Sequence, residues 1–473
     1  MTVSNAPSTS TPVAPLSFYG GVVGALTPFV LFLTGVGLLA LQGAPDERGF
    51  WPILLAALTV GLLLARDRTR YADAMLEGMG QPVVMIMLCA WLFSGVLGTV
   101  LSAGGLVDAL AGGARALDLS GGGYVVAAFV VAMLVSTATG TSFGTILLCG
   151  PILYPAGAGA AAHPAVLMGA ILAGATFGDS ISPVSDTTIA SSGTQQVDIG
   201  GTVRARLVYA LPAAAVALCI SGWLGGQGTE AVASAAVSTD WTPLGLLAAP
   251  LLTIGMLLRS RHLIESLLVG IATAVGLALL LGVLRPYDLL HVEPGSFGAT
   301  GVIVDGMQRA VGVSVFTLLL VGLVATLQAT NVLDQLVEQA ARRAHSARGA
   351  EGWIVGMVSA AVLLTTHSVV AILAVGEFAR QTGTRFGIDG YRRANLLDLT
   401  VCTWPFLLPY FLPTILAAGA TRGGGAMPVL TAGTVGVYNT YAWALVVMVG
   451  VAVVTGFGAS RSGVRERTES PSP

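Results

Sequence analysis

The chain has 473 residues, of which 54% are hydrophobic and 10% are charged. Soluble globular proteins carry about 25% charged residues, so this composition excludes an ordinary soluble protein and indicates a polytopic protein embedded in a lipid bilayer. The formal net charge of −2 excludes the basic surface of a nucleic-acid binder. Four cysteines lack the spacing of a zinc site or a disulfide framework, and we expect no cofactor: Cys89, Cys149, Cys219 and Cys402.

Long apolar runs predict helices that cross the roughly 30 Å hydrocarbon core of a bilayer, which takes about 20 residues. Such runs occur at 20–41, 81–103, 207–225, 266–284, 303–326 and 437–457, with shorter ones at 50–65 and 243–258. Four further segments are interrupted by Gly, Pro, Ser, Thr or Asp, at 122–156, 164–192, 353–378 and 394–418. We therefore expect some helices to be broken inside the membrane.

The arginines predict an orientation, because basic residues near span ends stay on the cytoplasmic side. Clusters occur at 66–70, 204–206, 259–261, 341–348, 391–393 and 461–467, whereas 226–241 has no basic residue. This distribution is self-consistent, with both termini cytoplasmic, if 122–156 and 353–378 each enter and leave on one face as re-entrant hairpins. Each is also long enough to cross once, so both alternatives stay open.

The two halves of the chain resemble each other. The segment that begins at Glu77 aligns with the one at Asp305, and Asp179 aligns with Asp398. Because runs 81–103 and 303–326 cross in opposite directions, the pattern is that of an inverted repeat, which is typical of secondary transporters. We expect a disordered tail at 1–17, a first membrane repeat at 18–225, an extracytoplasmic linker at 226–241, a second repeat at 242–460 and a cytoplasmic tail at 461–473.

The expected fold is therefore an all-α polytopic membrane protein. It has about 10–12 transmembrane helices in two inverted-topology repeats, with re-entrant hairpins and broken helices. The sequence does not specify an oligomeric state, and a homodimer is compatible with this fold.

An unusually polar stretch, 174–192, lies at membrane depth, with two aspartates, a proline and eight hydroxyl side chains. If the helix begins at Pro164, Asp179 falls past the middle of the bilayer. Pro183 lacks an N–H and clashes with the preceding turn, so we expect the helix to unwind over 178–183. Unwound backbone is tolerated in a membrane only where it is buried in protein or lines a cavity, and its carbonyl oxygens suit a small hard cation.

Two carboxylates in this stretch predict a site for cations and protons. A charged carboxylate in a membrane costs several kcal/mol, and such residues usually mark ion or proton paths. A site that takes either a proton or a cation gives exchange. The predicted ligands are Asp179 and Asp186, which would hold the transported sodium, with Ser180, Ser182, Ser185 and Thr187. Each hydroxyl could equally serve only to satisfy the backbone of the broken helix.

The second half supplies a matching set of polar residues. Asp398 is a candidate for the same cation and proton site, although a helix-end charge beside Arg392 and Arg393 is the alternative. His367 could relay protons or could simply be a hydrogen-bonded packing residue. The remaining residues that we expect to line the site are Thr141, Ser142, Thr365, Thr366, Asn395 and Thr400.

The motifs around these residues resemble those of the NhaC-type sodium/proton antiporters. The stretch GDSISPVSDTT at 178–188 is close to that family's Gly-Asp-x-x-Ser-Pro-x-Ser-Asp-Thr-Thr signature, and GTSFGT at 140–145 is similar to its earlier GTS-x-GT element. The resemblance covers roughly 70–460. It implies an exchanger of the bacterial inner membrane that couples sodium efflux to proton entry, with Asp179 and Asp186 as candidate ion-binding residues.

The second-half segment departs from the family pattern. The family usually has an acidic residue followed by Asp-Ser-Gly-Thr and later Pro-Trp-Asn, where this chain has LLDLTV and TWPF. Relatives in the same superfamily include malate/lactate exchangers and amino-acid transporters, so the resemblance leaves a carrier of a small organic anion or amino acid as the alternative function.

An enzyme is not expected. An intramembrane aspartyl protease would carry Gly-x-Gly-Asp, whereas Thr176 stands at the first glycine position before Asp179.

Overall fold

The computed structural model describes residues 15–41, 47–116, 121–183, 185–227, 241–260, 262–293, 298–330, 332, 346–423 and 427–458. Nine helices in these ranges are long and apolar enough to cross a membrane, and the shorter helices Arg48–Leu64, Thr242–Leu257 and Thr440–Thr455 are also apolar. The predicted class of polytopic helical membrane protein is confirmed. Except for residues 15–17, the predicted tails lie outside the described residues, as does most of the 226–241 linker.

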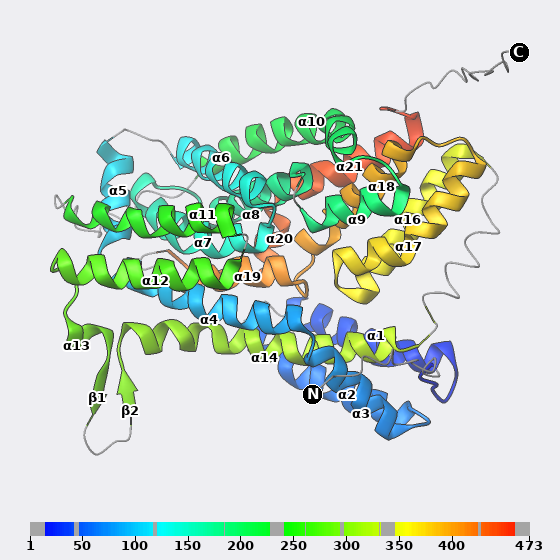
Figure 1. Ribbon diagram of the computed structural model, residues 1–473, viewed down its shortest axis with the longest axis horizontal. Helices are drawn as coiled ribbons and strands as arrows, with labels where there is room; N and C mark the ends of the chain where they lie inside the picture. The colour runs from blue at the N-terminus through cyan, green and yellow to red at the C-terminus, as the bar shows by residue number, and fades with distance from the viewer. Residues whose placement is uncertain are drawn as a thin grey trace, which may run out of the picture.

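The first half of the chain consists of helices. They are α1 (Val22–Leu41), η1 (Glu47–Phe50), α2 (Trp51–Leu64), α3 (Arg68–Met79), α4 (Pro82–Ala103), α5 (Leu106–Ala116), α6 (Gly121–Thr139), α7 (Ser142–Ala156), η2 (Gly157–Ala160), α8 (Pro164–Ile181), α9 (Asp186–Gln195) and α10 (Ile199–Gly225). Figure 1 shows most of these helices running along the long axis of the molecule.

The second half adds helices and one small sheet. The helices are η3 (Thr242–Leu247), α11 (Ala248–Ser260), α12 (Leu263–Leu280), α13 (Pro286–Leu289), α14 (Val302–Gln328), α16 (Ala347–Thr365), α17 (Ser368–Arg385), α18 (Gly390–Val401), η4 (Trp404–Phe406), α19 (Leu412–Ala420), η5 (Thr421–Gly423), α20 (Ala432–Val437) and α21 (Thr440–Thr455). Strands β1 (His291–Glu293) and β2 (Gly298–Thr300) pair antiparallel, which the all-α prediction missed. They project from one end of the bundle (Figure 1).

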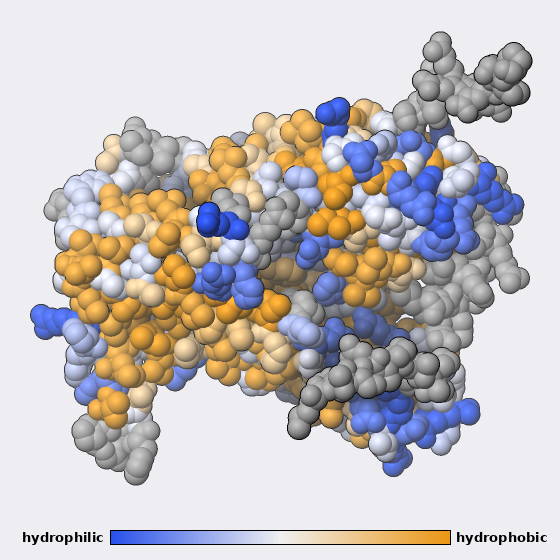
Figure 2. Space-filling view, viewed as in Figure 1, coloured by the Kyte–Doolittle hydropathy of each residue, from blue (hydrophilic) through white to orange (hydrophobic). Residues whose placement is uncertain are grey.

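The outer surface of the bundle is apolar. Large hydrophobic side chains stand exposed on several long helices, including Leu38, Val216, Trp223, Leu280 and Val454. Figure 2 shows apolar residues over most of the visible face and hydrophilic residues gathered towards the end where the C-terminus lies. Because lipid, unlike water, imposes no cost on such side chains, this surface fits a bilayer environment.

Two glycine contacts support the predicted inverted repeat. Gly95 of α4 lies against Gly306 of α14, and Gly78 of α3 lies against Ala325 near the other end of α14, so α14 runs antiparallel to α4. The alignment of the two halves pairs Gly306 with Gly78, an offset of 228 residues. The same offset pairs Ala325 with position 97, which is close to Gly95. The two contacts are therefore near-copies of each other, as two repeats of opposite direction require.

Segment 122–156 is a helical hairpin of α6 and α7 that returns to the end at which it begins. The Tyr124 hydroxyl near the start of α6 donates to the Leu153 carbonyl near the end of α7, at 2.9 Å. Gly121 also lies against Gly225 at the end of α10. Both ends of the segment therefore lie together at one end of the bundle, which the arginine distribution predicts to be extracytoplasmic.

Segment 353–378 is a second hairpin that enters from the opposite end. Glu351 of α16 forms a buried ion pair with Arg392 of α18, at 2.7 Å between Oε1 and Nε. Gly383 of α17 lies against the Arg393 side chain. Both ends of this hairpin thus lie beside the start of α18, close to the start of α10, where Tyr391 packs on Gly201. Both segments therefore return to the end at which they begin, which excludes a single crossing. Re-entry without crossing stays a prediction, because α6, α7 and α16 are each long and apolar enough to cross a membrane.

The helix break predicted over 178–183 begins later than expected. Helix α8 continues to Ile181, so Gly178, Asp179 and Ser180 are still helical, and only residues 182–185 separate α8 from α9. The physical reason is that a proline restricts the residue before it to extended conformations, and Ser182 has φ −73° and ψ 128°. The break therefore falls directly at Pro183.

Small residues let α8 pack very closely on the first hairpin. A Cβ atom added at Gly174 would lie 2.2 Å from the Phe129 carbonyl oxygen, and one at Gly178 would lie 2.6 Å from that of Met133. Gly174 and Gly178 are four residues apart and so share one helix face. This small-residue face holds Asp179 at a fixed place relative to α6.

Candidate cation site

A cavity of about 240 Å³ lies where the two hairpin tips meet the breaks in α8–α9 and α18–α19. The first tip contributes Thr141 and Ser142, and the second contributes Thr366 and His367. The α8–α9 break contributes Asp179, Ser185, Asp186 and Thr187, while most of the remaining wall is apolar. Since a water molecule takes about 30 Å³ of liquid volume, the cavity has room for a hydrated ion or a small solute.

Two serine hydroxyls hydrogen-bond to Asp179. Ser142 at the first hairpin tip donates to its Oδ2 at 2.7 Å, and Ser185 in the break donates to its Oδ1 at 2.6 Å. Ser185 also shares a hydrogen bond with the hydroxyl of Thr187, at 3.1 Å. Carboxylate and hydroxyl oxygens are the ligands that hard cations prefer, so the group around Asp179 suits a small cation such as sodium.

Asp186 lies across the break from Asp179, as the first residue of α9, and is exposed to the cavity. His367 faces the same cavity, and its Nδ1 atom has no hydrogen-bond partner among the described residues. The preceding Thr366 has φ +52°, a left-handed conformation that is strained for a β-branched residue. Such strain concentrates at functional sites, and here it turns the second hairpin tip towards the cavity.

The charge of the cavity is negative. Of the described residues that line it, only Asp179 and Asp186 carry a formal charge, and none is an arginine. The described residues contain no group of three or more His, Cys, Asp or Glu side chains able to hold a metal ion. A transported ion is bound transiently, so an open site of two carboxylates with hydroxyls is the appropriate kind of arrangement.

Asp398 lies outside this cavity. It is fully buried on α18 and forms an ion pair with Arg206 of α10, with 2.5 Å between Oδ2 and Nη1. The arginine pattern of the sequence places Arg206 with Arg204 in a cytoplasmic cluster and does not predict that the Arg206 side chain is completely buried. Arg204 is exposed, whereas Arg206 two positions later points to the opposite side of the helix and into the protein.

Five other predicted site residues are also absent from the described lining of the cavity. Ser180 and Ser182 donate to the carbonyls of Phe177 and Thr137, and Thr400 donates to that of Leu396. The structure therefore brings together the following predicted residues: Asp179, Asp186, Ser185, Thr187, Thr141, Ser142, Thr366 and His367. Those that it places elsewhere are Ser180, Ser182, Asp398, Thr365, Asn395 and Thr400.

Arg206 and Trp91 were not predicted from the sequence. In the sequence Arg206 directly precedes the apolar run 207–225. Because α10 begins seven residues earlier, Arg206 lies inside the helix, where a buried charge needs a partner. Trp91 carried no such signal, since a tryptophan in an apolar helix is unremarkable in sequence.

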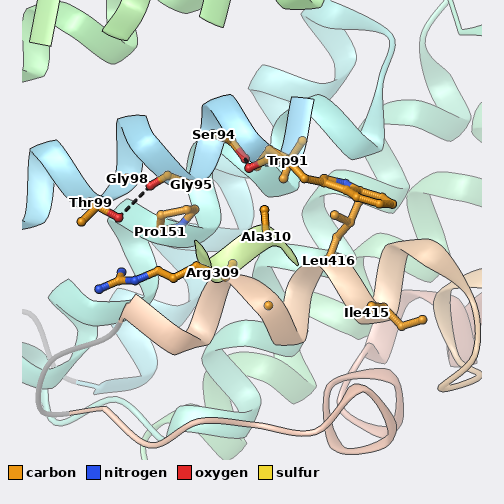
Figure 3. A pocket seen from close by; sticks show the side chains of 13 residues that line it. Trp91, Ser94, Gly95, Gly98, Thr99, Pro151, Arg309, Ala310, Ile415 and Leu416 are labelled. Atoms are coloured by element: carbon orange, nitrogen blue, oxygen red, sulfur yellow. Dashed lines mark hydrogen bonds between the residues drawn. The ribbon is translucent and has the colours of Figure 1, made fainter. Parts of the chain in front are cut away.

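Trp91 separates the acidic cavity from a second pocket on its outer side. Both are lined by Trp91 and Leu147. From these two residues the second pocket extends along α4 to Thr99 and along α7 to Pro151. In Figure 3 the Arg309 guanidinium lies at the end of the pocket opposite Trp91. Trp91 itself is only 3% exposed and fills the space between the two volumes.

Residues 2–223 match the model of the Na+/H+ antiporter family. The Na+/H+ antiporter NhaC of Alkalihalophilus pseudofirmus is 26% identical over 320 residues, which cover 62% of this chain and 66% of that protein. The arginine/ornithine antiporter ArcD of Halobacterium salinarum is 23% identical, covering 74% of each chain. The malate-2H+/Na+-lactate antiporter of Bacillus subtilis is 27% identical, covering 41% of this chain and 39% of its own length.

Among solved structures, the YdaH transporter of Alcanivorax borkumensis is 16% identical with a TM-score of 0.38, covering 92% of this chain and 99% of that one. The match to the family model includes the signature at 178–188 and the GTSFGT element at 140–145. The chain is a multi-pass membrane protein whose residues 2–223 resemble the Na+/H+ antiporter family, and its listed relatives include two Na+/H+ antiporters named NhaC.

Proposed function

We propose that this chain is a secondary antiporter that exchanges sodium or lithium for protons across the bacterial inner membrane by alternating access. The observation that carries the proposal is the charge of the cavity, because two carboxylates line its wall and no arginine or lysine is among the described lining residues. Such a site attracts small cations and protons, and it opposes the entry of anions.

Asp179 is the group at which the two ions compete. When it is charged, its two oxygens accept hydrogen bonds from Ser142 and Ser185 and can coordinate sodium. When it is protonated, it has no charge with which to hold the cation. Each ion therefore displaces the other, and movement of the loaded site between the two faces gives exchange.

The two hairpins supply the barriers of this cycle. They enter from opposite ends and their tips meet at the cavity, so displacement of one tip would open the site to one face while the other stays closed. Transport of this kind requires no covalent step, and we assign no catalytic residue. A homodimer stays a prediction, in which exposed apolar residues such as Trp223 would contact either lipid or a second copy.

A small organic solute is the second candidate. The cavity of about 240 Å³ exceeds the space of a bare ion and has apolar walls. Its acidic lining favours a cationic amino acid over malate or lactate, because a solute with a net negative charge would find no arginine or lysine partner among the described lining residues.

The test uses inside-out vesicles from an antiporter-deficient strain, energised with lactate or ATP and containing a dye that reports the internal acidity. Addition of sodium or lithium is expected to restore the dye signal, since cation entry drives protons out. Malate, arginine and ornithine are added separately, and vesicles without the protein serve as the control. Recovery with arginine or ornithine but with no inorganic cation would replace the proposal with the solute carrier.

Trp91→Ala is expected to uncouple exchange. Loss of the indole would join the acidic cavity to the outer pocket, so protons would leak and the dye gradient would fall before any sodium is added. Truncation of a buried tryptophan also costs about 3–5 kcal/mol of stability, so membrane-inserted protein must be quantified in parallel.

The matched control is Trp223→Ala, which removes a side chain that is 70% exposed on the outer surface of α10. It should leave the gradient as in the unaltered protein. A Trp91→Ala protein that inserts normally and shows full coupling would contradict the barrier role of Trp91.

A further inference from the structure

Arg206 places a positive charge beside Asp398, the carboxylate near the end of α18. Its Nη1 atom lies 2.5 Å from Asp398 Oδ2, and both side chains are fully buried. The exchange mechanism proposed above for Asp179 does not use this pair, since neither residue is among the described residues that line the acidic cavity.

The other partners of Arg206 are oxygen atoms of the kind that bind hard cations. Its Nη1 atom donates to the hydroxyl of Thr188 at 2.8 Å and to the main-chain carbonyl of Ser180. Its Nε atom donates to the amide oxygen of Asn395 at 2.8 Å. Because Ser180 lies in the last turn of α8, its carbonyl has lost its usual helical partner. Carbonyl, hydroxyl, amide and carboxylate oxygens from both broken helices thus converge on one guanidinium.

The two repeat-related aspartates differ in one respect that decides their chemistry. Asp179 lies two residues before the end of α8, and Asp398 lies three residues before the end of α18. Asp179 accepts hydrogen bonds from neutral hydroxyls and faces a cavity. Asp398 accepts longer hydrogen bonds than Asp179 does, from the hydroxyls of Thr188 and Ser191 at 3.2 and 3.3 Å. The charge of Asp398 is balanced by Arg206.

From these contacts we infer that Arg206 is a tethered cation that fills the second-half ion site, so that only the site at Asp179 and Asp186 exchanges sodium. The inference rests on the proposed function for the role of Asp179. Its consequence is that one sodium binds per chain, although the repeat supplies two carboxylate sites. The Nη2 atom of Arg206 is buried without a hydrogen-bond partner among the described residues, so the protein does not satisfy the guanidinium completely.

The test counts bound sodium by equilibrium dialysis with radioactive sodium on the purified full-length protein, with choline replacing sodium in the reference. The unaltered protein is expected to bind one sodium, and Arg206→Ala is expected to bind two, because the vacated oxygens can then hold an ion. Adding Asp398→Asn to Arg206→Ala should return the count to one. A folded Arg206→Ala protein that binds no additional sodium would overturn the inference.

If Arg206→Ala does not yield folded protein, Arg206→Met with Asp398→Asn decides instead, because it removes both buried charges together. That protein is expected to bind one sodium and to exchange it in vesicles, whereas loss of exchange would show that the pair takes part in transport and would overturn the inference.

The same measurements separate this inference from the antiport proposal. Suppose that the unaltered protein binds no sodium while Arg206→Ala gains one that depends on Asp398. The antiport proposal then fails and the tethered cation stands. Conversely, a single sodium that Asp179→Asn abolishes, together with no gain in Arg206→Ala, would support antiport at Asp179 and overturn the tethered cation.

Discussion

Asp179→Asn is expected to abolish sodium-dependent proton movement in vesicles while leaving the protein inserted and folded. The amide has nearly the same shape as the carboxylate and can still hydrogen-bond with Ser142 at the first hairpin tip and with Ser185 in the break between α8 and α9. Both contacts should therefore persist. The charge is lost, however, and a sodium ion left in the cavity would lack its main counter-ion. An uncompensated buried charge costs about 3 kcal/mol or more, which corresponds to at least about 100-fold weaker binding.

The matched control for this variant is Asp198→Asn. Asp198 is an exposed carboxylate that caps the start of α10, and a hydrogen bond from the Tyr391 hydroxyl holds the pKa of Asp198 below its usual range. It is therefore a charged group outside the cavity, and asparagine caps a helix as well as aspartate does. Exchange should be near that of the unaltered protein. Full exchange in Asp179→Asn would remove Asp179 from the site.

The architecture could be predicted because the membrane constrains it strongly. Apolar length gives the spans, and glycine, proline and hydroxyl residues within a span indicate where a helix breaks. The position of the break at 182–185 was predicted less well, because α8 stays helical up to Ile181. A proline acts most strongly on the residue directly before it, so the glycine and aspartate further back keep their helical hydrogen bonds.

The choice between hairpin and crossing could not be made from length. Each disputed segment has enough apolar residues to cross, and only contacts between its two ends reveal that it returns. In the first segment this contact is the hydrogen bond of Tyr124 with Leu153, and in the second both ends meet α18, through Glu351 with Arg392 and Gly383 with Arg393. A single sequence contains no direct record of such pairings.

Only the part of the candidate site that comes from the first half of the chain could be predicted from the sequence. The motif around Asp179 brings its own ligands within a few residues, since Ser185 and Asp186 lie in the same break. Asp398 lacks such a local motif, and its partner Arg206 lies in the other half of the chain. A rule that counts arginines near span ends treats Arg206 as a cytoplasmic marker, because the rule does not consider which helix face each arginine occupies.

Gly178→Ala is expected to destabilise the protein and to remove most of its exchange activity. A Cβ atom at this position would lie 2.5 Å from the Ser136 Cβ atom, 2.6 Å from the Met133 carbonyl oxygen and 2.6 Å from the Thr137 nitrogen. Two of these are backbone atoms of the first hairpin, which cannot turn aside as a flexible side chain would. Overpacking of this kind costs about 1–3 kcal/mol. The hairpin must move away from α8, and its tip carries Ser142 away from Asp179.

The control is Gly450→Ala on α21, for which we expect stability to stay unchanged or to rise rather than to fall. A Cβ atom there would meet nothing within 4 Å, and alanine favours a helix interior over glycine by about 0.5–1 kcal/mol. Thermal unfolding of the two purified proteins should therefore move to a lower temperature for Gly178→Ala, and stay unchanged or rise slightly for Gly450→Ala. Vesicle exchange should fall at least about tenfold only in the former, because a shift in the hairpin tip of a few tenths of an ångström weakens the hydrogen bond that orients Asp179. Equal unfolding temperatures and equal exchange rates would mean that the close packing of α8 on the first hairpin does not set the geometry of the cation site.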